Sequence, residues 1–301
     1  MPFSDTNTGV IIEEPKVQDW LFGSQGSMIG DVFQIDGQWL SFVPTGEKQL
    51  NKWFNSFGCV SFSALNCLEI LYKRKYGEDI NFSDRYTVVA SGTVPLYGNS
   101  LRAVAESLRV GFVYEDILPF NAEMSQDEYY TPLSAETRLK GATIASGYIV
   151  QWEWIGRTQA NMLEALKYAP LQIIIAFSRK DINQDGIYER VEWELNHAVT
   201  LIGYELNKFW IVLDSMDGEI KRLAWDYKMD YPLRFSFRKK EELKYGELVK
   251  TATSPKIYFV GRTGRIAWIP DEKSFKSLWG EFTGIKTVDY IPTNTLTLKI
   301  I

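Results

Sequence analysis

The sequence predicts an α+β fold, and three observations support this. Apolar residues recur at helical spacing through much of the first half of the 301-residue chain. Short runs rich in Ile, Val and Phe follow in the second half, which is typical of buried strands. The two patterns do not alternate, so helices packed on an antiparallel sheet are favoured over parallel β–α–β units.

The longest predicted helix spans about residues 59–76. Apolar residues recur there at helical spacing, three basic residues fill the last turn, and Gly77 is a stop signal. Ser83 and Ser100 are predicted to cap two further helices, because a serine hydroxyl accepts hydrogen bonds from the free N–H groups of a first helical turn. The second of these helices is predicted to end at Gly111.

A fourth helix and three strands are predicted next along the chain. The helix lies in QANMLEALKYAP and is stopped by Pro170, which cannot continue a helix. The strands have the sequences LQIIIAF, NHAVTLIGY and KFWIVLD. The last two are joined by a short polar turn, which predicts an antiparallel pair.

Two domains are predicted. Residues 1–250 form the main domain, and residues 255–301 form a small C-terminal α/β module of unknown role. The charged stretch RKKEELKYGELVKTATSP separates them. The module is predicted to contain two strands and a short helix that begins at Asp271.

Charge and composition exclude several kinds of partner. The formal net charge is −5 and no basic block is present, so nucleic acid is not expected to bind. No run of about 18 apolar residues is present, so no membrane span is expected. The N-terminal MPFSDTNTGVIIEEP is polar and acidic and predicts no signal peptide, which favours a cytoplasmic location. The only cysteines, Cys59 and Cys67, would lie about 12 Å apart on one helix, too far for a disulfide.

Three residues that are distant in sequence form the candidate catalytic group. Cys59 begins the longest helix, where the helix dipole favours a thiolate. His197, the only histidine, begins a predicted strand, and Asp214 ends the next one. An imidazole next to a thiol activates it as a nucleophile, and a carboxylate on the other ring nitrogen orients the imidazole. Gly58 is expected to let the backbone approach closely, so that the Cys59 N–H helps to bind an oxyanion.

Three segments resemble the papain-like cysteine peptidase family. FGCVSFSALNCLE is similar to the segment that carries the family's nucleophile, and NHAVTLIGY with FWIVLDSMDG is similar to its histidine and asparagine segments. The resemblance covers about residues 45–225 and implies a papain-like fold, in which a helical subdomain with a central Cys-bearing helix packs on an antiparallel β subdomain. It also implies that Cys59 is the nucleophile, His197 the acid and base, Asp214 the orienting group and Gln49 an oxyanion donor.

The sequence departs from the family pattern at several positions. Asp214 stands where the family mostly has Asn, Val60 and Met216 replace tryptophans, and Gln49 precedes Cys59 by ten residues where six are usual. The loss of the second tryptophan puts the shielding of the contact between His197 and Asp214 in question. These departures are similar to those of divergent phage or bacterial members of the family.

The resemblance implies a cysteine peptidase, a hydrolase that acts on a peptide or protein substrate through a Cys acyl-enzyme. Two alternatives remain open. The same three residues also suit amide transfer to an amine, as in transglutaminase-type acyltransferases. A papain-like fold without activity would instead be a binding or structural protein, for which a virion-associated location is the analogy.

The segment DINQDGIYERVE, residues 181–192, predicts a structural Ca²⁺ site. Asp181, Asn183 and Asp185 occupy ligand positions 1, 3 and 5 of a calcium loop, Ile187 offers its carbonyl at position 7, and Glu192 falls at position 12. Calcium prefers six to eight oxygen ligands, roughly what this spacing supplies. A solvated acidic turn is the alternative.

Overall fold

The chain divides into two units, Met1–Lys239 and Lys240–Ile301. The computed structural model describes most residues of the first unit and part of the second. The described residues are 9–16, 19, 21–23, 33–45, 48–121, 123–177, 182–192, 194–240, 246–251, 254–260, 266–269, 273, 276, 284–288 and 296–297.

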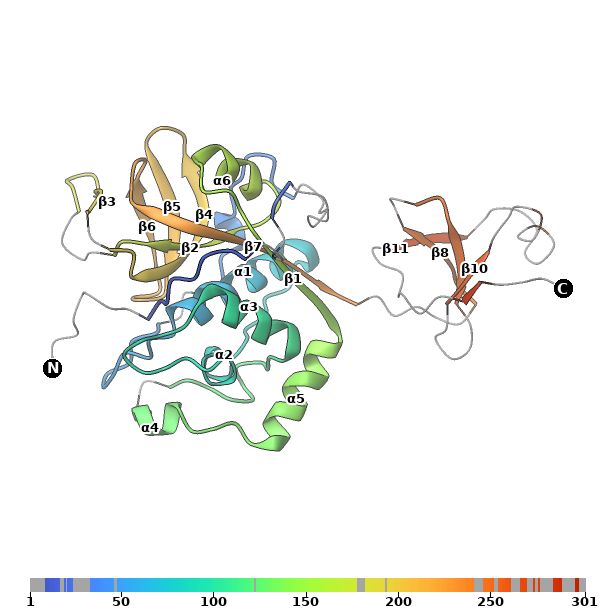
Figure 1. The fold of residues 1–301 in the computed structure, drawn as a ribbon, viewed down its shortest axis with the longest axis horizontal. Coiled ribbons are helices and arrows are strands. Elements are labelled where there is room, and N and C mark those ends of the chain that lie inside the picture. The colour runs from blue at the N-terminus through green and yellow to red at the C-terminus, as the bar shows by residue number, and fades with distance from the viewer. Residues whose placement is uncertain are drawn as a thin grey trace. The chain divides into compact units, whose positions relative to one another are not determined.

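In unit 1, most of the helices come before the strands of the sheet in the sequence (Figure 1). The helices are α1 (Cys59–Tyr76), α2 (Asp84–Ala90), α3 (Leu101–Val110), α4 (Gln126–Tyr129), α5 (Ala135–Ser146) and α6 (Gln159–Leu166), with a 3-10 turn at Leu40–Phe42. The strands are β1 (Tyr148–Trp154), β2 (Leu171–Ile175), β3 (Ile187–Tyr188), β4 (His197–Glu205), β5 (Phe209–Asp214), β6 (Glu219–Ala224) and β7 (Met229–Lys239). The α+β prediction is therefore confirmed.

The seven strands form one sheet in the order β1-β7-β2-β4-β5-β6-β3. Every pair is antiparallel except β3 with β6. Strands β4 and β5 are neighbours at the centre of the order, so the beginning of one lies beside the end of the other. This arrangement brings residues 197 and 214 to the same end of these two central strands.

Helix α1 lies between the sheet and the helices α2 and α3 (Figure 1). It begins at Cys59 and ends at Tyr76, and Gly77 caps it in the left-handed conformation, as predicted. Fourteen consecutive residues, from Cys59 to Tyr72, are buried, because the helix has packed neighbours on more than one side. The predicted caps at Ser83 and Ser100 are also confirmed, since both hydroxyls accept a main-chain N–H of the first turn.

The boundary between the two units differs from the prediction. It lies at 239/240 instead of at 250–255, because the strand β8 (Leu248–Thr251) pairs with β9 (Ile257–Val260) and β11 (Ile285–Val288). Unit 2 is a sheet in the order β11-β8-β9-β10-β12, with β10 at Ile266–Ile269 and β12 at Leu296–Thr297. Most of the helix predicted to begin at Asp271 lies outside the described residues.

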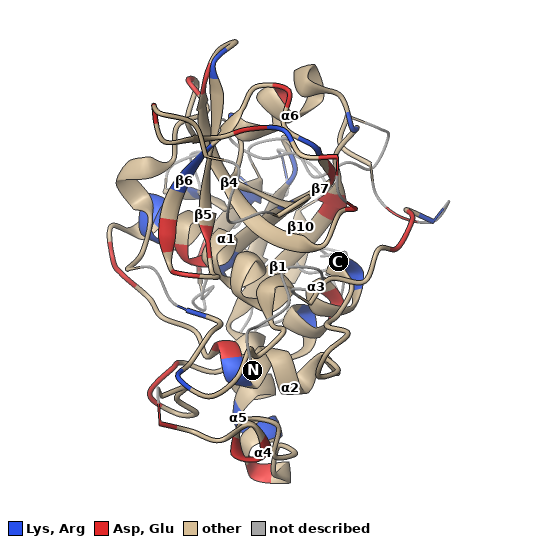
Figure 2. Ribbon diagram, turned by 90° about the vertical axis from the view of Figure 1, so that its left-hand side faces the viewer, with Lys and Arg blue, Asp and Glu red and all other residues tan. Residues whose placement is uncertain are grey.

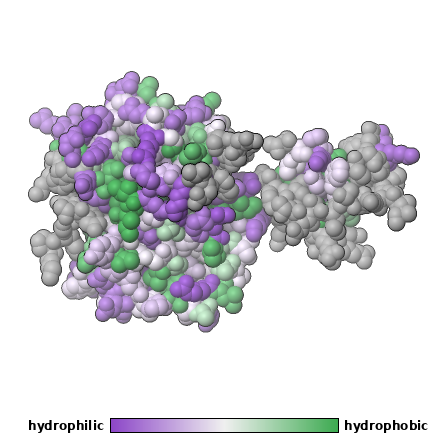
Figure 3. Space-filling view, in the orientation of Figure 1, coloured by the Kyte–Doolittle hydropathy of each residue, from purple (hydrophilic) through white to green (hydrophobic). Residues whose placement is uncertain are grey.

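Charged and apolar residues are mixed on the surface of unit 1. Lys and Arg are interspersed with Asp and Glu along the ribbon (Figure 2). On the face shown in Figure 3, hydrophobic residues gather in small patches between hydrophilic ones. Among the described residues, no helix combines the length and the apolar character needed to cross a membrane.

Gly58 is required by packing directly before α1. Its φ of −93° is open to any residue, but a Cβ there would lie 2.7 Å from Cγ2 of Val88 and 3.2 Å from the Phe62 ring. The chain directly before α1 is thus packed closely against α2, and this contact helps to fix the position of Cys59, the first residue of α1.

Replacing Gly58 with Ala is expected to lower the free energy of unfolding by about 1–3 kcal/mol, because the added methyl group overpacks this contact. Thermal or urea denaturation measures the change. Gly147→Ala is the matched control, since Gly147 has an α-region backbone and its nearest atom would be 3.4 Å from the new Cβ. Equal stability of the two variants would contradict the packing argument.

Candidate active site

His197 at the start of β4 and Asp214 at the end of β5 meet side by side. Nε2 of His197 lies 2.6 Å from Oδ1 of Asp214, and the two side chains are 0% and 1% exposed. The pairing of Thr200 with Leu213 in the β4–β5 ladder brings the two side chains into reach of each other. A single antiparallel pair therefore aligns an imidazole with a buried carboxylate.

The carboxylate of Asp214 has two further partners. The main-chain N–H of Met216 donates to Oδ1 at 2.8 Å, and Nζ of Lys221 donates to Oδ2 at 2.5 Å. Lys221 also lies 2.6 Å from Oδ2 of Asp217, at the turn between β5 and β6. The sequence analysis does not identify Lys221. Its only signal is that it falls in phase with the inward-facing Leu223 of β6.

Cys59 reaches the same point from the helical side. It is the first residue of α1 and is fully buried. Nδ1 of His197 is buried and has no hydrogen bond of normal geometry among the described residues, and the Cys59 side chain interacts with this ring. The structure thus brings Cys59, His197 and Asp214 together in the order that the sequence predicts.

The charge on His197 is set by two opposing effects. Burial lowers the pKa of the imidazole, but the Asp214 carboxylate and, to a smaller degree, Cys59 outweigh burial and raise the pKa to about 9. Burial also raises the pKa of Asp214, but His197 and then Lys221 hold it well below its usual range. The imidazolium and the carboxylate therefore form an ion pair at neutral pH.

A buried hydrogen-bond network holds the first turn of α1 on the sheet. Nε2 of Gln172 in β2 donates to the carbonyl of Val60 at 2.7 Å and lies 2.9 Å from Oγ of Ser63. The Ser63 hydroxyl donates to the carbonyl of Cys59 at 2.7 Å, and Thr200 in β4 donates to the carbonyl of Ser63 at 3.0 Å. Since β2 and β4 also carry the register around His197, this network fixes the helix end relative to the imidazole.

The pair of His197 and Asp214 is buried beside an aromatic ring. The Phe177 ring lies 5.0 Å from the imidazole, centroid to centroid, and Met216 is buried. Phe177, which the sequence analysis did not identify, covers one face of the imidazole, and the contact with Asp214, whose shielding was in question, is buried. Low water access strengthens the electrostatic interaction between the imidazole and the carboxylate.

Gln49 lies close to this group but is tied into the protein. Its Nε2 donates to Oδ1 of Asn55 at 3.0 Å, its Oε1 accepts from the Ser215 hydroxyl at 2.8 Å, and its main-chain N–H donates to the Ser215 carbonyl. The residue therefore connects the segment before α1 with the turn that follows Asp214. Its role as an oxyanion donor stays a prediction.

The second cysteine, Cys67, lies two turns further along α1 and is also fully buried. Burial raises the pKa of its thiol well above the usual range, and an interaction with Thr200 opposes this only in part. Cys67 has no imidazole partner, since His197 is the only histidine in the chain. It is therefore expected to stay a neutral thiol in the core.

The described residues among the predicted calcium ligands do not converge on one point. Oδ1 of Asn183 accepts the main-chain N–H groups of Asp185 and Ile187, both at 3.0 Å. Glu192 instead pairs with Arg190 at 2.8 Å, and Asp181 lies outside the described residues. Within the described part of the chain, no three His, Cys, Asp or Glu side chains lie close enough to hold a metal ion. The calcium site stays a prediction.

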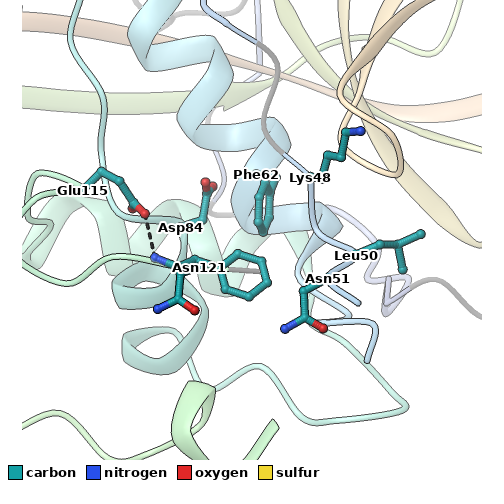
Figure 4. A pocket seen from close by; sticks show the side chains of 8 residues that line it. Lys48, Leu50, Asn51, Phe62, Asp84, Glu115 and Asn121 are labelled. Carbon is teal, nitrogen blue, oxygen red and sulfur yellow. Dashed lines mark hydrogen bonds between the residues drawn. The ribbon is translucent and has the colours of Figure 1, made fainter. Parts of the chain in front are cut away.

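A cavity of about 240 Å³ lies on the side of α1 that faces the helices. Phe62 of α1 points into it, with Asp84 and Glu115 on one side and Lys48 and Leu50 on the other (Figure 4). One oxygen of Glu115 accepts the main-chain N–H of Phe120 at 2.6 Å. Cys59, His197 and Asp214 do not line this cavity.

Comparison with known proteins identifies the family. A model of the papain family of cysteine proteases matches residues 55–220, which is more than half of the chain. The chain belongs to the papain family. Members of this family are cysteine peptidases and hence hydrolases, so the predicted family, fold and enzyme class are confirmed.

A curated relative and two solved structures agree with this membership. Macrodontain-1 of Ananas macrodontes is 26% identical over 166 residues, which cover 52% of this chain and 72% of the relative. The cysteine protease and lectin-like domains of Cwp84, a surface layer associated protein of Clostridium difficile, match with a TM-score of 0.55 and 16% identity over 85% of this chain. The clostridial protease Cwp84 after propeptide cleavage matches with a TM-score of 0.50 and 16% identity over 67% of this chain.

The two solved structures show the papain-like fold alone, because their identity to this chain is low. The matches cover 61% and 57% of those chains, so this chain spans less than two thirds of each. The papain-family match includes Cys59, His197 and Asp214, all of which lie within residues 55–220.

The pKa of the His197 imidazole is expected to be about 9, well above its ordinary value of 6.5. Because the folded-state pKa is raised, the ion pair stabilises the fold fully below about pH 6.5, and this stabilisation is lost as the pH rises through about 9. NMR of protein labelled at histidine measures this directly, since the chain has one imidazole. A titration midpoint near 6.5 would show that Asp214 does not hold the proton.

Proposed function

We propose that this papain-family chain hydrolyses peptide bonds through an acyl-enzyme on Cys59. The observation that carries the proposal is the position of His197, which is bonded to Asp214 through Nε2 while Nδ1 remains available on the Cys59 side. This is the arrangement that a thiol nucleophile with a general acid and base requires.

In the first half of the reaction, Cys59 attacks the carbonyl carbon of the scissile bond as a thiolate. The electrons of the carbonyl double bond move to oxygen, and the main-chain N–H at the N-terminal end of α1 stabilises the resulting oxyanion. The oxyanion then collapses, the C–N bond breaks, and imidazolium His197 gives its proton to the leaving amine. The acyl group remains on sulfur as a thioester.

In the second half, neutral His197 removes a proton from a water molecule, whose oxygen attacks the thioester carbonyl. The C–S bond breaks, the carboxylic acid leaves and the thiolate–imidazolium pair forms again. Asp214 keeps the imidazole ring in one orientation through both halves. Hydrolysis is expected to decline as the pH rises through about 9, since His197 then lacks the proton for the leaving amine.

The nature of the acceptor separates hydrolysis from the acyltransferase alternative. Adding a primary amine to a peptide substrate would divert the thioester to an amide in an acyltransferase. We propose water as the acceptor, because the family to which the chain belongs consists of proteases. A product that is mainly amide at millimolar amine would favour acyl transfer instead.

Cys59→Ala is expected to abolish peptide hydrolysis, because the nucleophile is lost, while Cys67→Ala keeps most of it. Fluorogenic peptide cleavage measures both. An iodoacetamide-type probe on the wild-type protein, followed by peptide mapping, should label Cys59 first. Labelling of Cys67 at the same or a higher rate, or full activity in Cys59→Ala, would exclude this mechanism. A wild-type protein that cleaves no peptide would favour a fold without catalytic activity.

We also propose that residues 181–192 bind Ca²⁺ in a structural role, with Asn183, Asp185 and the Ile187 carbonyl as ligands from the described turn. The turn is held by Asn183, and Gly186 has a φ of +74°, which suits a tight calcium loop. Glu192 would have to leave Arg190 to reach the ion.

Isothermal calorimetry is expected to show calcium binding by the wild-type protein and its loss in Asp185→Ala, because one carboxylate ligand is removed. Asp226→Ala is a matched control, since it removes one acidic side chain elsewhere in the same unit. Equal heats for all three proteins, or no heat for any, would eliminate the site.

A further inference from the structure

Lys221 is buried where the strand pattern calls for an apolar residue. In β6 the side chain of Lys221 is 7% exposed, whereas its apolar neighbour Ile220 is 46% exposed. The two residues thus show the opposite of the usual preference, in which lysine stays in water. Burying an ammonium group is costly unless it is paired, so a specific interaction keeps Lys221 inside.

The partners of Lys221 identify that interaction. Nζ lies 2.5 Å from Oδ2 of Asp214 and 2.6 Å from Oδ2 of Asp217. It also lies over the ring of Phe177, 5.3 Å from the centroid, and over the ring of Tyr188, 5.7 Å from the centroid. Phe177 packs on His197 as well, so Lys221, Phe177 and Asp214 form one layer behind the imidazole.

The two oxygens of Asp214 therefore bind two different cations. Oδ1 accepts from His197 and Oδ2 accepts from Lys221. A bare buried carboxylate would bind the imidazolium proton so strongly that the ring would release it poorly to a leaving amine. A lysine on the other oxygen, shared with Asp217, offsets part of that charge and keeps the hydrogen-bond acceptor in place.

We propose that Lys221 is a positioning residue that acts through Asp214, so that its ammonium offsets part of the carboxylate charge and limits how tightly His197 holds its proton. The proposal rests on the proposed peptidase function, because it concerns the acid and base of that reaction. It also gives a physical reason for an aspartate at position 214, where the papain-like pattern mostly has an uncharged asparagine.

The titratable groups around His197 come from five elements. Cys59 approaches from α1, Asp214 from β5, Asp217 from the turn after β5, Lys221 from β6, and Tyr188 lies behind Lys221 on β3. Of these, Lys221 is the cation whose removal leaves the Asp214 charge without its second partner. This makes one substitution, Lys221→Met, a clean electrostatic test with an apolar side chain of similar length.

NMR titration of the single histidine provides a readout that does not depend on turnover. Lys221→Met is expected to raise the pKa of His197 by about one unit, because a nearby positive charge is lost. Asp214→Asn is expected to lower it by about one unit or more, because the negative partner is lost and the ammonium remains. Lys221→Arg, which keeps the charge, and Lys208→Met, which removes an exposed lysine in the turn between β4 and β5, should stay near wild type.

Peptide cleavage and alkylation of Cys59 provide the second readout. Lys221→Met is expected to lower kcat several-fold in the wild-type background but to raise it in the Asp214→Asn background, since it removes a buried charge that has lost one of its partners. A purely structural role would lower the rate in both backgrounds. This reversal of sign is therefore the result that an anchoring role alone would not give.

An unchanged or lower His197 pKa in Lys221→Met would overturn the proposal. If that variant does not fold, the comparison of Asp214→Asn with the double variant decides, and there too the pKa must rise when Lys221 is removed. If the variants show the expected shifts of the His197 pKa but the wild-type protein cleaves no peptide, the peptidase function is overturned and the charge balance is supported. Cleavage without the pKa shifts would do the reverse.

Discussion

The hydrogen bond between Nε2 of His197 and Oδ1 of Asp214 is the interaction on which the rest of the site depends. It joins two charged groups that are almost fully removed from water, and such a pair persists only when the remaining polar atoms also have partners. The Met216 N–H and the Lys221 ammonium supply those partners for the carboxylate. The other ring nitrogen of His197 is left for Cys59, so the orientation of the imidazole follows from how Asp214 is held.

The architecture makes this arrangement rigid from both sides. On the sheet, His197 and Asp214 belong to paired antiparallel strands, so the distance between them is set by the ladder. On the helical side, Gly58 allows α1 to press against Val88, and Gln172 with Ser63 binds the first helical turn to β2. The nucleophile is thus placed by packing and hydrogen bonds that lie outside the reacting groups.

Much of this could be predicted from sequence, because the relevant signals are local. The bounds of α1, the caps at Ser83 and Ser100, and the strands that carry His197 and Asp214 follow from capping residues and apolar runs. The prediction missed β1 and β7, where the partners Glu153 and Arg234 form a buried ion pair that breaks the apolar pattern. The unit boundary was also misplaced, because the charged stretch around residue 248 contains a strand.

Lys221 and Phe177 illustrate why the remainder of the site could not be predicted from the sequence. A lysine in a strand is ordinarily read as facing water, and only the contact with Asp214 explains its burial. Phe177 follows a run of apolar residues and is indistinguishable from a core side chain until its ring is seen against His197. Both depend on which strands become neighbours, which is information that local spacing does not contain.

The central claim is that His197 activates the sulfur of Cys59. The most direct measurement is the rate at which a neutral disulfide probe reacts at pH 6 with Cys67→Ala protein, in which Cys59 is the only thiol, with and without His197→Ala. The account predicts that loss of the imidazole slows the reaction by about tenfold or more, because the positive partner of the thiolate is removed. Equal rates in the two proteins would contradict it.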